Sequence, residues 1–310
     1  MKIFLPGGAG LVGLNLVSMI QNSYPEWEII VVDKNSKKVQ FAKKLFPNVK
    51  FINEDLADDL NEMEWKKNII NVNACVILQA EISNLEDYQF YKNNILSTKI
   101  ICNHLRRIKC KRIIHISSSV INSVISDVYT KTKIEQEQIV KEIFPKCLIL
   151  RPTLMFGPFD RKHLGWIATF MKRFPILPIP GNGKFIRQPL YVKDFCSIIV
   201  KCLEDTSING TFNITGLERI SYLSLMKQIK KITKSKNIII FIKKNIFSLL
   251  LKFWSLISSK PVFTESQLNA LLAGDEFDIY NWPDIFSVNA TSLHQALKES
   301  FQDKELNLKK

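Results

Sequence analysis

The chain has 310 residues, of which 46% are apolar and 23% are charged. This composition is typical of a folded globular protein and excludes a disordered or low-complexity chain. The length allows one or two domains, and no apolar run is long enough for a membrane-spanning helix. The apolar run near the N-terminus is broken at Pro6, which favours a strand and a turn over a signal peptide.

The formal net charge is +14, from 43 basic and 29 acidic residues. Such an excess of positive charge can favour binding to nucleic acid, to an anionic membrane or to a phosphorylated substrate. The basic residues are mostly scattered lysines, without a basic stripe interleaved with aromatic residues. This pattern is typical of proteins from AT-rich genomes, and we expect no nucleic-acid partner.

Six cysteines occur without a C-x-x-C pair, and several of them fall inside apolar runs. They are predicted to be free core thiols in a reduced, cytoplasmic protein. The four histidines pair with no cysteine or carboxylate at ligand spacing, so we expect no metal site.

Short apolar segments alternate with helical stretches through the first half of the chain. The expected strands are at 3–5, 28–33, 49–52, 74–80, 112–117 and 147–151. This alternation predicts an α/β fold, a Rossmann-type doubly wound parallel sheet with a smaller C-terminal α/β substrate lobe. The expected domains are an NAD-binding one at 1–160, with contributions from about 185–205, and a mostly substrate-binding lobe at 161–310.

The stretch KIFLPGGAGLVG, at 2–13, fits two glycine templates. Gly8, Gly10 and Gly13 give G-x-G-x-x-G, whereas Gly7, Gly10 and Gly13 give G-x-x-G-x-x-G. Both predict a sharp turn after a strand, where a pyrophosphate lies against the N-terminus of the next helix.

Asp33 ends the second expected strand, twenty residues after Gly13. A carboxylate there accepts hydrogen bonds from the adenosine ribose and repels a 2′-phosphate, which favours NAD over NADP. Alternatively, Asp33 is only the first residue of a turn. Asp55, at the end of the third expected strand, is expected near the adenine. Three nearby lysines could tolerate a phosphate: Lys34, Lys37 and Lys38.

Tyr129 and Lys133 are four residues apart and therefore share one face of a helix. An ammonium one turn away favours the phenolate and lowers the pKa of the tyrosine, which suits it to exchange a proton with a hydroxyl. Tyr88 and Lys92 repeat the spacing, but only Tyr129 follows a run of serines.

Several motifs occur together and in order: the glycine run, Asp33, the serines at 117–119, Tyr129 with Lys133, and LRPTLMFGP at 150–158. Residues 1 to about 235 thereby resemble an extended short-chain dehydrogenase/reductase of the NAD-dependent epimerase/dehydratase family. The resemblance selects Gly7, Gly10 and Gly13 as the working glycines. It implies that Tyr129 shuttles a proton, Lys133 binds the nicotinamide ribose and Ser119 binds the reacting oxygen, with Ser117 and Ser118 as alternatives.

The resemblance also implies further binding positions. Arg187 would meet a substrate phosphate, although it could be a surface cation, and Asp194 would cap a helix. Asn94 matches a structural asparagine of the family. The expected cofactor-binding residues are Gly7, Gly10, Leu11, Val12, Gly13, Asp33, Asp55, Leu56, Ala80, Asn94, Lys133 and Pro152.

The chain also departs from the family pattern. Val120 and Ile121 stand where 4,6-dehydratases of the family carry an Asp-Glu pair, which disfavours dehydration. Tyr129 follows Ser119 by only ten positions, so the loop over the substrate is short. Thr153 stands where nucleotide-sugar enzymes of the family often have asparagine. The sequence at 77–81 is ILQAE, where IHLAA is more usual in the family. These changes weaken the substrate assignment.

The second half fits a smaller lobe, with helices expected at 164–174 and 221–233, the latter with Ser221 as N-cap, and a loop at 175–186. The segment at 246–261 is mostly apolar and follows Lys243 and Lys244. It could contact a membrane surface through 246–257, or cover the core of its own lobe, which its length favours. The polar tail beyond about 302 is expected to fray.

The expected function is an NAD-dependent epimerase of a nucleotide-activated sugar, which works through a transient keto intermediate. The same residues would serve an NAD(P)-dependent reductase or dehydrogenase. The alternative from another class is an NAD-binding structural or redox-sensing subunit. A homodimer is a further expectation.

Overall fold

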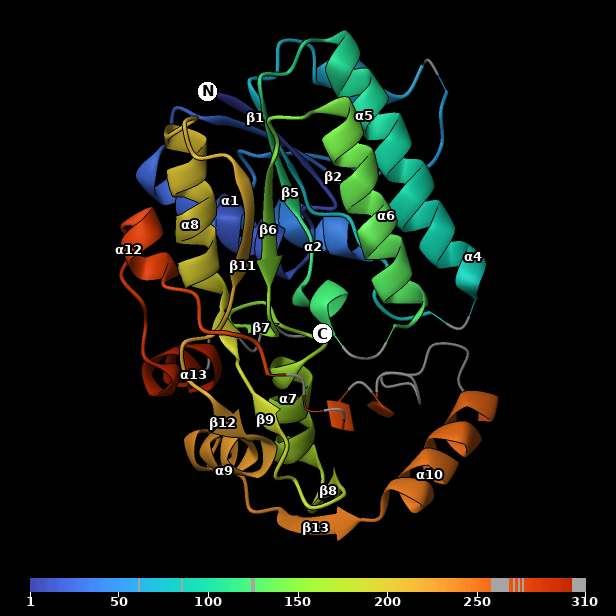
Figure 1. The fold of residues 1–310 in the computed structure, drawn as a ribbon, viewed down its shortest axis with the longest axis vertical. Coiled ribbons are helices and arrows are strands. Elements are labelled where there is room, and N and C mark those ends of the chain that lie inside the picture. The colour runs from blue at the N-terminus through green and yellow to red at the C-terminus, as the bar shows by residue number, and fades with distance from the viewer. Residues whose placement is uncertain are drawn as a thin grey trace.

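The N-terminal lobe is built on a sheet of parallel strands (Figure 1). The structure is a computed structural model that describes residues 1–60, 62–84, 86–123, 126–257, 268–269, 271–272, 274 and 276–302, without the side chains of 254–257. Within these residues the strand order is β11-β6-β5-β4-β1-β2-β3. The strands are β1 (Lys2–Pro6), β2 (Glu28–Val32), β3 (Lys50–Ile52), β4 (Ala74–Ile77), β5 (Arg112–Ile116), β6 (Leu148–Pro152) and β11 (Gly210–Ile214).

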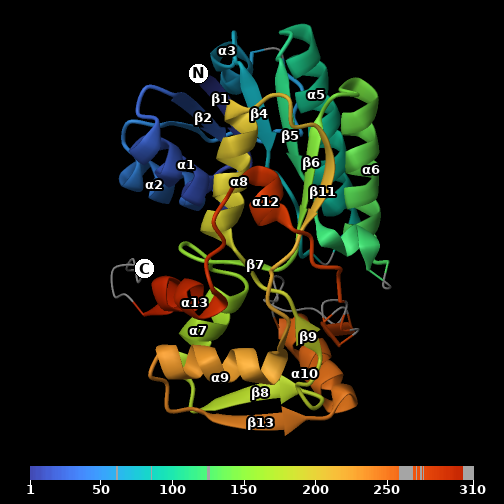
Figure 2. The same cartoon turned by 60° about the vertical axis from the view of Figure 1, so that its left-hand side comes forward.

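Helices cover both faces of this sheet (Figures 1 and 2). One face packs against α1 (Leu11–Ser23), α2 (Ser36–Leu45) and α8 (Val192–Glu204). The other packs against α3 (Glu64–Asn68), α5 (Ser97–Arg107), which continues α4 (Asp87–Phe90) through a π-helical turn, and α6 (Val128–Ile143). Ile3 and Leu5 belong to the first core and Phe4 to the second, as strand alternation requires. The predicted Rossmann-type fold is confirmed.

The edge strand β11 is absent from the strands expected from the sequence. Its residues, GTFNI, become more buried only toward Ile214, so it lacks the continuous apolar run of a central strand. A buried arginine of β5 binds the chain that leads into β11. The Arg112 guanidinium donates to the carbonyl oxygens of Cys202 at 3.0 Å and Ile208 at 2.7 Å, just before β11.

The C-terminal lobe surrounds a third core formed mainly by α7 (Leu164–Arg173), α9 (Tyr222–Ile232) and α13 (Leu293–Phe301). The Ser221 hydroxyl accepts from the Ser224 N–H, which confirms the predicted N-cap of α9. Further helices are α10 (Lys244–Ile257) and α12 (Trp282–Phe286), and α12 packs on the first core. The strand pairs are β7 (Met155–Phe156) with β10 (Leu190–Tyr191), β9 (Ile186–Arg187) with β12 (Ile220–Ser221), and β8 (Ile176–Pro180) with β13 (Ile238–Ile242).

The expectation of a loop over 175–186 is wrong where β8 forms a parallel pair with β13. Pro178 and Pro180 suggested a loop because proline has no N–H for a ladder. The Gly181 N–H donates to Ile242 of β13, so the odd-numbered N–H groups face the partner strand. The two prolines therefore fall on the free edge, where a missing N–H costs nothing.

The six cysteines are buried and free, which confirms the predicted core thiols. In the described part of the chain, none of the helices combines the length and the apolar character needed to cross a bilayer.

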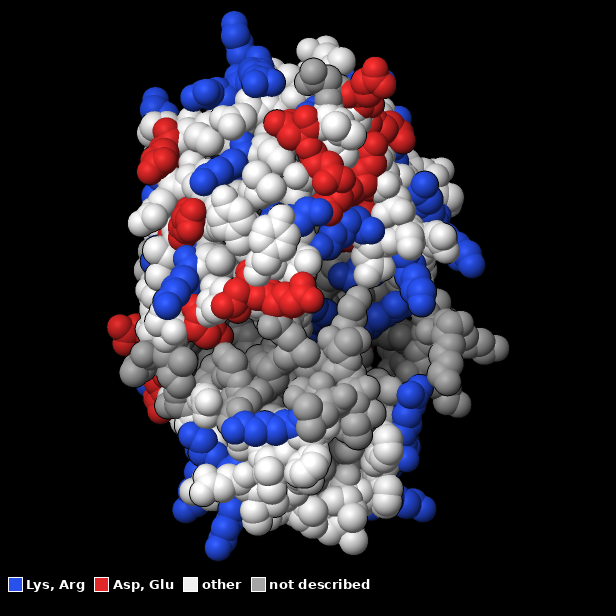
Figure 3. All heavy atoms as spheres, turned by 90° about the vertical axis from the view of Figure 1, so that its right-hand side faces the viewer, with Lys and Arg blue, Asp and Glu red and all other residues white. Residues whose placement is uncertain are grey.

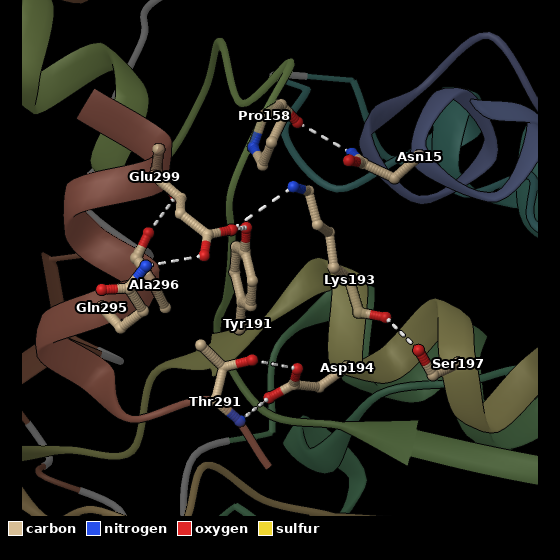
Figure 4. A network of polar contacts seen from close by, with 11 residues as sticks. Asn15, Pro158, Tyr191, Lys193, Asp194, Ser197, Thr291, Gln295, Ala296 and Glu299 are labelled. Atoms are coloured by element: carbon tan, nitrogen blue, oxygen red, sulfur yellow. Dashed lines mark hydrogen bonds and ion pairs between the residues drawn. The ribbon is translucent and has the colours of Figure 1, made fainter. Parts of the chain in front are cut away.

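Asp194 does not cap a helix as expected, because it lies inside the first turn of α8. Its carboxylate accepts from the Thr291 N–H at 2.9 Å and from the Thr291 hydroxyl at 2.7 Å (Figure 4). Glu299 of α13 in turn accepts from the Tyr191 hydroxyl at 2.7 Å and pairs with Lys193 at 3.3 Å. These contacts attach the chain before and within α13 to α8.

We expect an Asp194→Ala variant to lower the free energy of unfolding by about 1–3 kcal/mol, because the half-buried N–H and hydroxyl of Thr291 lose their acceptor. Urea denaturation measures the change. Asp205→Ala is the control, because the exposed Asp205 carboxylate accepts its hydrogen bonds from Ser207, within its own turn. An equal loss in both variants would contradict the role given to Asp194.

Candidate functional site

The glycine loop after β1 is shaped by close backbone contacts. Gly7 has a φ of +75°, and a Cβ there would lie 2.5 Å from the Gln79 Cα. A Cβ on Gly13 would lie 2.1 Å from the Gly8 carbonyl oxygen, so Gly13 lets α1 approach the loop. A Cβ on Gly8 itself would lie 2.9 Å from the Leu5 carbonyl oxygen. Gly7, Gly8 and Gly13 are therefore sterically required, so packing does not choose between the two glycine templates.

Gly10 differs from these glycines because nothing crowds it. A Cβ there would meet only the Gly7 carbonyl oxygen, at 3.7 Å. Gly10 is the N-cap of α1, without a side-chain cap, and the first turn carries no acidic residue. The N–H groups and positive dipole end of α1 thus face a space that a side chain would fill, and this arrangement fits a dinucleotide pyrophosphate.

Asp33 follows β2 at the same edge of the sheet. Its side chain is 9% exposed, and Oδ1 accepts from the Asn35 N–H at 2.9 Å. The Lys34 ammonium donates to the Asn93 side chain at 2.6 Å, so that lysine has a protein partner. This placement fits a ribose-binding carboxylate.

Asp55 pairs with Lys92 at 2.9 Å, which accounts for the second Y-x-x-x-K motif. Burial opposes ionisation of Asp55, but the Ala57 N–H and the Lys92 ammonium hold the pKa of this carboxyl below its usual range. Tyr88 is 62% exposed. Lys92 therefore balances an acidic residue rather than serving Tyr88.

Tyr129 lies in the first turn of α6, whose N-cap is Asp127. The phenol is half-buried and hydrogen bonds with the Ser118 hydroxyl. Ser118 is also the N-cap of the 3₁₀ turn at Ser119–Asn122, and Ser119 is buried beside it. The structure thus brings the serine run to Tyr129, and Ser118 is the serine that contacts the phenol.

Lys133 is fully buried one turn further along α6. Its ammonium donates to the Ile116 carbonyl oxygen at 2.9 Å and to Gln136 Oε1 at 2.5 Å. An ammonium has three donors, so these contacts leave one for a ribose hydroxyl. This geometry fits the role that the resemblance implies.

The expected lowering of the Tyr129 pKa by Lys133 is not found. Burial raises the pKa of Tyr129 to about 12, against the hydrogen bond from Ser118, and the Asp127 charge adds to the rise. Burial also lowers the pKa of Lys133 to about 7, and only Glu137 opposes this. Burial therefore disfavours the charged forms of both groups, because each loses water on folding.

A chain of side-chain amides that the sequence analysis missed connects Lys133 to the glycine loop. Gln136 accepts from Lys133 and donates to the Thr98 hydroxyl at 2.8 Å, and Gln79 donates to the same hydroxyl at 3.0 Å. Gln79 is the residue that Gly7 approaches. Two signals were available, because Gln136 shares the helix face of Lys133 and Gln79 stands in the unusual ILQAE stretch.

Asn94 is fully buried in the π-helical turn before α5. Its side chain accepts from the Glu81 N–H at 2.7 Å and donates to the Thr132 hydroxyl at 3.0 Å. Asn94 thus holds the loop after β4 against α6.

Two further buried groups lie beside Lys133. His115 of β5 is fully buried, and burial together with the Lys133 charge holds its pKa well below the usual value. Glu137 forms a bidentate pair with Arg151 at 2.9 and 2.7 Å. Burial opposes ionisation of Glu137, but Arg151 holds its pKa below the usual range. Lys133 therefore has a neutral imidazole and the Glu137–Arg151 ion pair near it.

We expect the stability of a Lys133→Met variant to differ from that of the wild type in a pH-dependent way. Folding lowers the Lys133 pKa from 10.5 to about 7, so between these values only the unfolded wild type binds the proton. The free energy of unfolding of the wild type should rise relative to Lys133→Met by roughly 2–4 kcal/mol from pH 7 to pH 10. Urea denaturation across this range measures the difference, and parallel pH curves would contradict it.

Arg187 of β9 faces the C-terminal segment. Its guanidinium donates to the Leu271 carbonyl oxygen and lies 5.3 Å from the centroid of the Phe185 ring. The structure therefore places Arg187 against the protein, and not as a bare surface cation.

The other expected cofactor positions lie along the same sheet edge or in the first turn of α1. Val12, Leu56 and Pro152 are buried, Leu11 is half-buried, and Ala80 is exposed after β4. Among the described residues, no group of three or more His, Cys, Asp or Glu side chains could hold a metal ion.

Comparisons with known proteins add the following relatives. A trifunctional UDP-glucose 4,6-dehydratase, UDP-4-keto-6-deoxy-D-glucose 3,5-epimerase and UDP-4-keto-L-rhamnose-reductase of Arabidopsis thaliana is 24% identical over 262 residues. The match covers 74% of this chain but 39% of that protein. Subunit 9 of the NADH dehydrogenase [ubiquinone] 1 alpha subcomplex of Mus musculus is 29% identical over 167 residues, which is 53% of this chain and 44% of the subunit. The chain thus spans less than half of either relative.

Among solved structures, the UDP-glucuronic acid 4-epimerase of Bacillus cereus in complex with NAD shares the fold, with a TM-score of 0.73 and 20% identity over 99% of both chains. The same enzyme has been solved with UDP-glucuronic acid and NAD bound.

The profile of the NAD-dependent epimerase/dehydratase family matches residues 3–215. This span includes the glycine loop, Asp33, and the α6 pair of Tyr129 and Lys133. The family is NAD-dependent, which confirms the cofactor predicted from the sequence. The chain is therefore a member of the NAD-dependent epimerase/dehydratase family.

Proposed function

We propose that the chain is an NAD-dependent epimerase of a nucleotide-activated sugar. The observation that carries the proposal is the arrangement at one sheet edge, where α6 holds Tyr129 and Lys133 beside the serine run. The amide chain from Lys133 leads from there to the open glycine loop. Residues 1–160 would hold NAD, and the lobe at 161–310 would hold the sugar nucleotide, with Arg187 on a phosphate.

The proposed chemistry is proton transfer at a sugar hydroxyl. NAD, when bound, supplies the reversible two-electron acceptor. Tyr129 takes the hydroxyl proton and returns it after the sugar carbon has been reduced from its other face. The Ser118 hydroxyl favours the phenolate by donating to it, whereas burial disfavours it. Ser119 would hold the reacting oxygen, and Lys133 would bind the nicotinamide ribose through its remaining donor.

Water elimination is disfavoured at this site. Val120 and Ile121 occupy the 3₁₀ turn after Ser119 and supply neither acid nor base. Dehydration of a sugar needs a further protein acid and base, one to protonate the leaving hydroxyl and one to take a proton from the neighbouring carbon. The same phenol and ammonium would serve a net dehydrogenase or reductase, which remains the alternative within the enzyme class.

A non-catalytic NAD-binding subunit is the second candidate function. The 29% identity to subunit 9 of the mouse NADH dehydrogenase alpha subcomplex favours it, because that relative is named as a subunit of a larger complex. The raised pKa of Tyr129 is also compatible with an inert phenol.

The test is a single turnover with the NAD-loaded chain in excess over each member of a panel of UDP- and dTDP-sugars. Absorbance at the wavelength of the reduced cofactor and NMR of the sugar are recorded together. An epimerase gives a transient absorbance that decays while the inverted sugar forms.

The other outcomes separate the alternatives. A lasting absorbance change with an oxidised sugar would identify a dehydrogenase. Bound NAD with unchanged sugars and no absorbance change across the panel would favour the structural subunit.

A further inference from the structure

The end of the C-terminal lobe remote from the sheet carries charge of one sign. Residues 219–264 include nine lysines and one arginine but no aspartate or glutamate. In Figure 3, the lower end of the molecule shows uncharged side chains bordered by basic ones. This distribution is local, because the rest of the chain mixes both signs.

Helix α10 presents an exposed apolar stripe at this end. Four side chains at i, i+3, i+4 and i+7 are more than half exposed: Ile246 at 53%, Leu249 at 55%, Leu250 at 53% and Phe253 at 60%. None of the side chains at 244–253 is buried. The expectation that this segment covers the core of its own lobe is therefore wrong for these residues, and α10 is an amphipathic surface helix.

Strand β13 and helix α9 extend the same surface. Ile238 and Ile240, which alternate onto one face of β13, are 66% and 38% exposed. The C-terminal half of α9 and the start of β13 line a shallow hollow that holds four lysines: Lys227, Lys230, Lys231 and Lys234. Both views of the fold place α9, β13 and α10 at this end (Figures 1 and 2). Apolar side chains and lysines therefore lie next to each other.

This combination indicates the chemistry of the occupant. A second copy would set lysine against lysine, since the region has no acidic residue of its own. An anionic lipid surface supplies both complements, because its phosphates attract lysines and its acyl boundary accepts an apolar helix face.

We propose that this surface, formed by the α10 stripe, Ile238 and Ile240 of β13 and the α9 lysines, binds anionic phospholipid. The α10 stripe lies in the plane of the interface, and the lysines of the hollow lie over the phosphates. The molecule is held at the membrane without a spanning helix. The sheet edge with Tyr129 belongs to the other lobe.

Sedimentation of the full chain with vesicles tests the proposal. The vesicles contain phosphatidylcholine alone or phosphatidylcholine mixed with phosphatidylglycerol. One variant combines Lys227→Gln, Lys231→Gln and Lys234→Gln, and its charge-matched control combines Lys43→Gln, Lys44→Gln and Lys67→Gln on the N-terminal lobe. A second variant combines Leu249→Ser with Leu250→Ser, and its control combines Leu60→Ser with Ile70→Ser, which are also exposed.

We expect the wild type and both controls to bind the anionic vesicles but not the neutral ones. The lysine variant should bind roughly a hundredfold more weakly, at about fivefold per lysine. The leucine variant should also lose binding, and added salt should weaken binding by the wild type. Absence of wild-type binding, or equal binding by a variant and its control, would overturn the proposal. So would lipid-free dimers in analytical ultracentrifugation that only the leucine variant abolishes.

Discussion

A Tyr129→Phe variant is expected to fold and bind NAD like the wild type, while its turnover falls roughly 10²- to 10⁴-fold. The change removes the phenolic oxygen that exchanges the sugar proton and leaves the aromatic ring in place. Turnover is measured with the sugar nucleotide that the single-turnover panel identifies, and NAD affinity is measured by calorimetry.

Tyr88→Phe is the matched control for this prediction. Tyr88 also precedes a lysine by four residues, but it is exposed, and its lysine pairs with Asp55. Its turnover should be unchanged. Equal turnover in Tyr129→Phe and the wild type would remove Tyr129 from the reaction.

The second large effect is expected at the glycine loop. Gly10→Val should lower NAD affinity roughly a hundredfold, because the side chain fills the space in front of the α1 N–H groups and costs about 3 kcal/mol of charge-assisted hydrogen bonding. The free energy of unfolding should change by only about 1 kcal/mol, because a Cβ at position 10 meets only the Gly7 carbonyl oxygen, at 3.7 Å.

Gly13→Ala is expected to behave in the opposite way. Its Cβ would lie 2.1 Å from the Gly8 carbonyl oxygen, so α1 must move away from the loop even without NAD. We expect a loss of roughly 3 kcal/mol or more in the free energy of unfolding. Calorimetric titration and urea denaturation of both variants separate the two roles, and a Gly13→Ala variant as stable as the wild type would contradict the steric role.

The sequence predicts the central sheet well because buried parallel strands are apolar throughout. Ile3, Phe4 and Leu5 pack on both faces, so neither face needs a polar residue. β11 was not predicted, because it is a half-buried edge strand without a continuous apolar run. β8 was not predicted either, because Pro178 and Pro180 indicate a loop unless the partner strand is known.

The candidate site divides in the same way. The spacing of Tyr129 and Lys133 follows from helix geometry and is readable in the sequence. The pKa values of both groups depend on burial and are not readable there. The bond of Lys133 to Ile116, and those of Thr98 to Gln79 and Gln136, join segments far apart in the chain. Only the folded backbone brings these groups together.

The most direct measurement is a crystal structure of the chain with NAD and a sugar nucleotide bound. We predict that the Tyr129 hydroxyl lies within hydrogen-bonding distance of a sugar hydroxyl and that the Lys133 ammonium contacts the nicotinamide ribose. A ternary complex in which the residue 129 side chain reaches neither the sugar nor the nicotinamide would contradict the proposed role of α6.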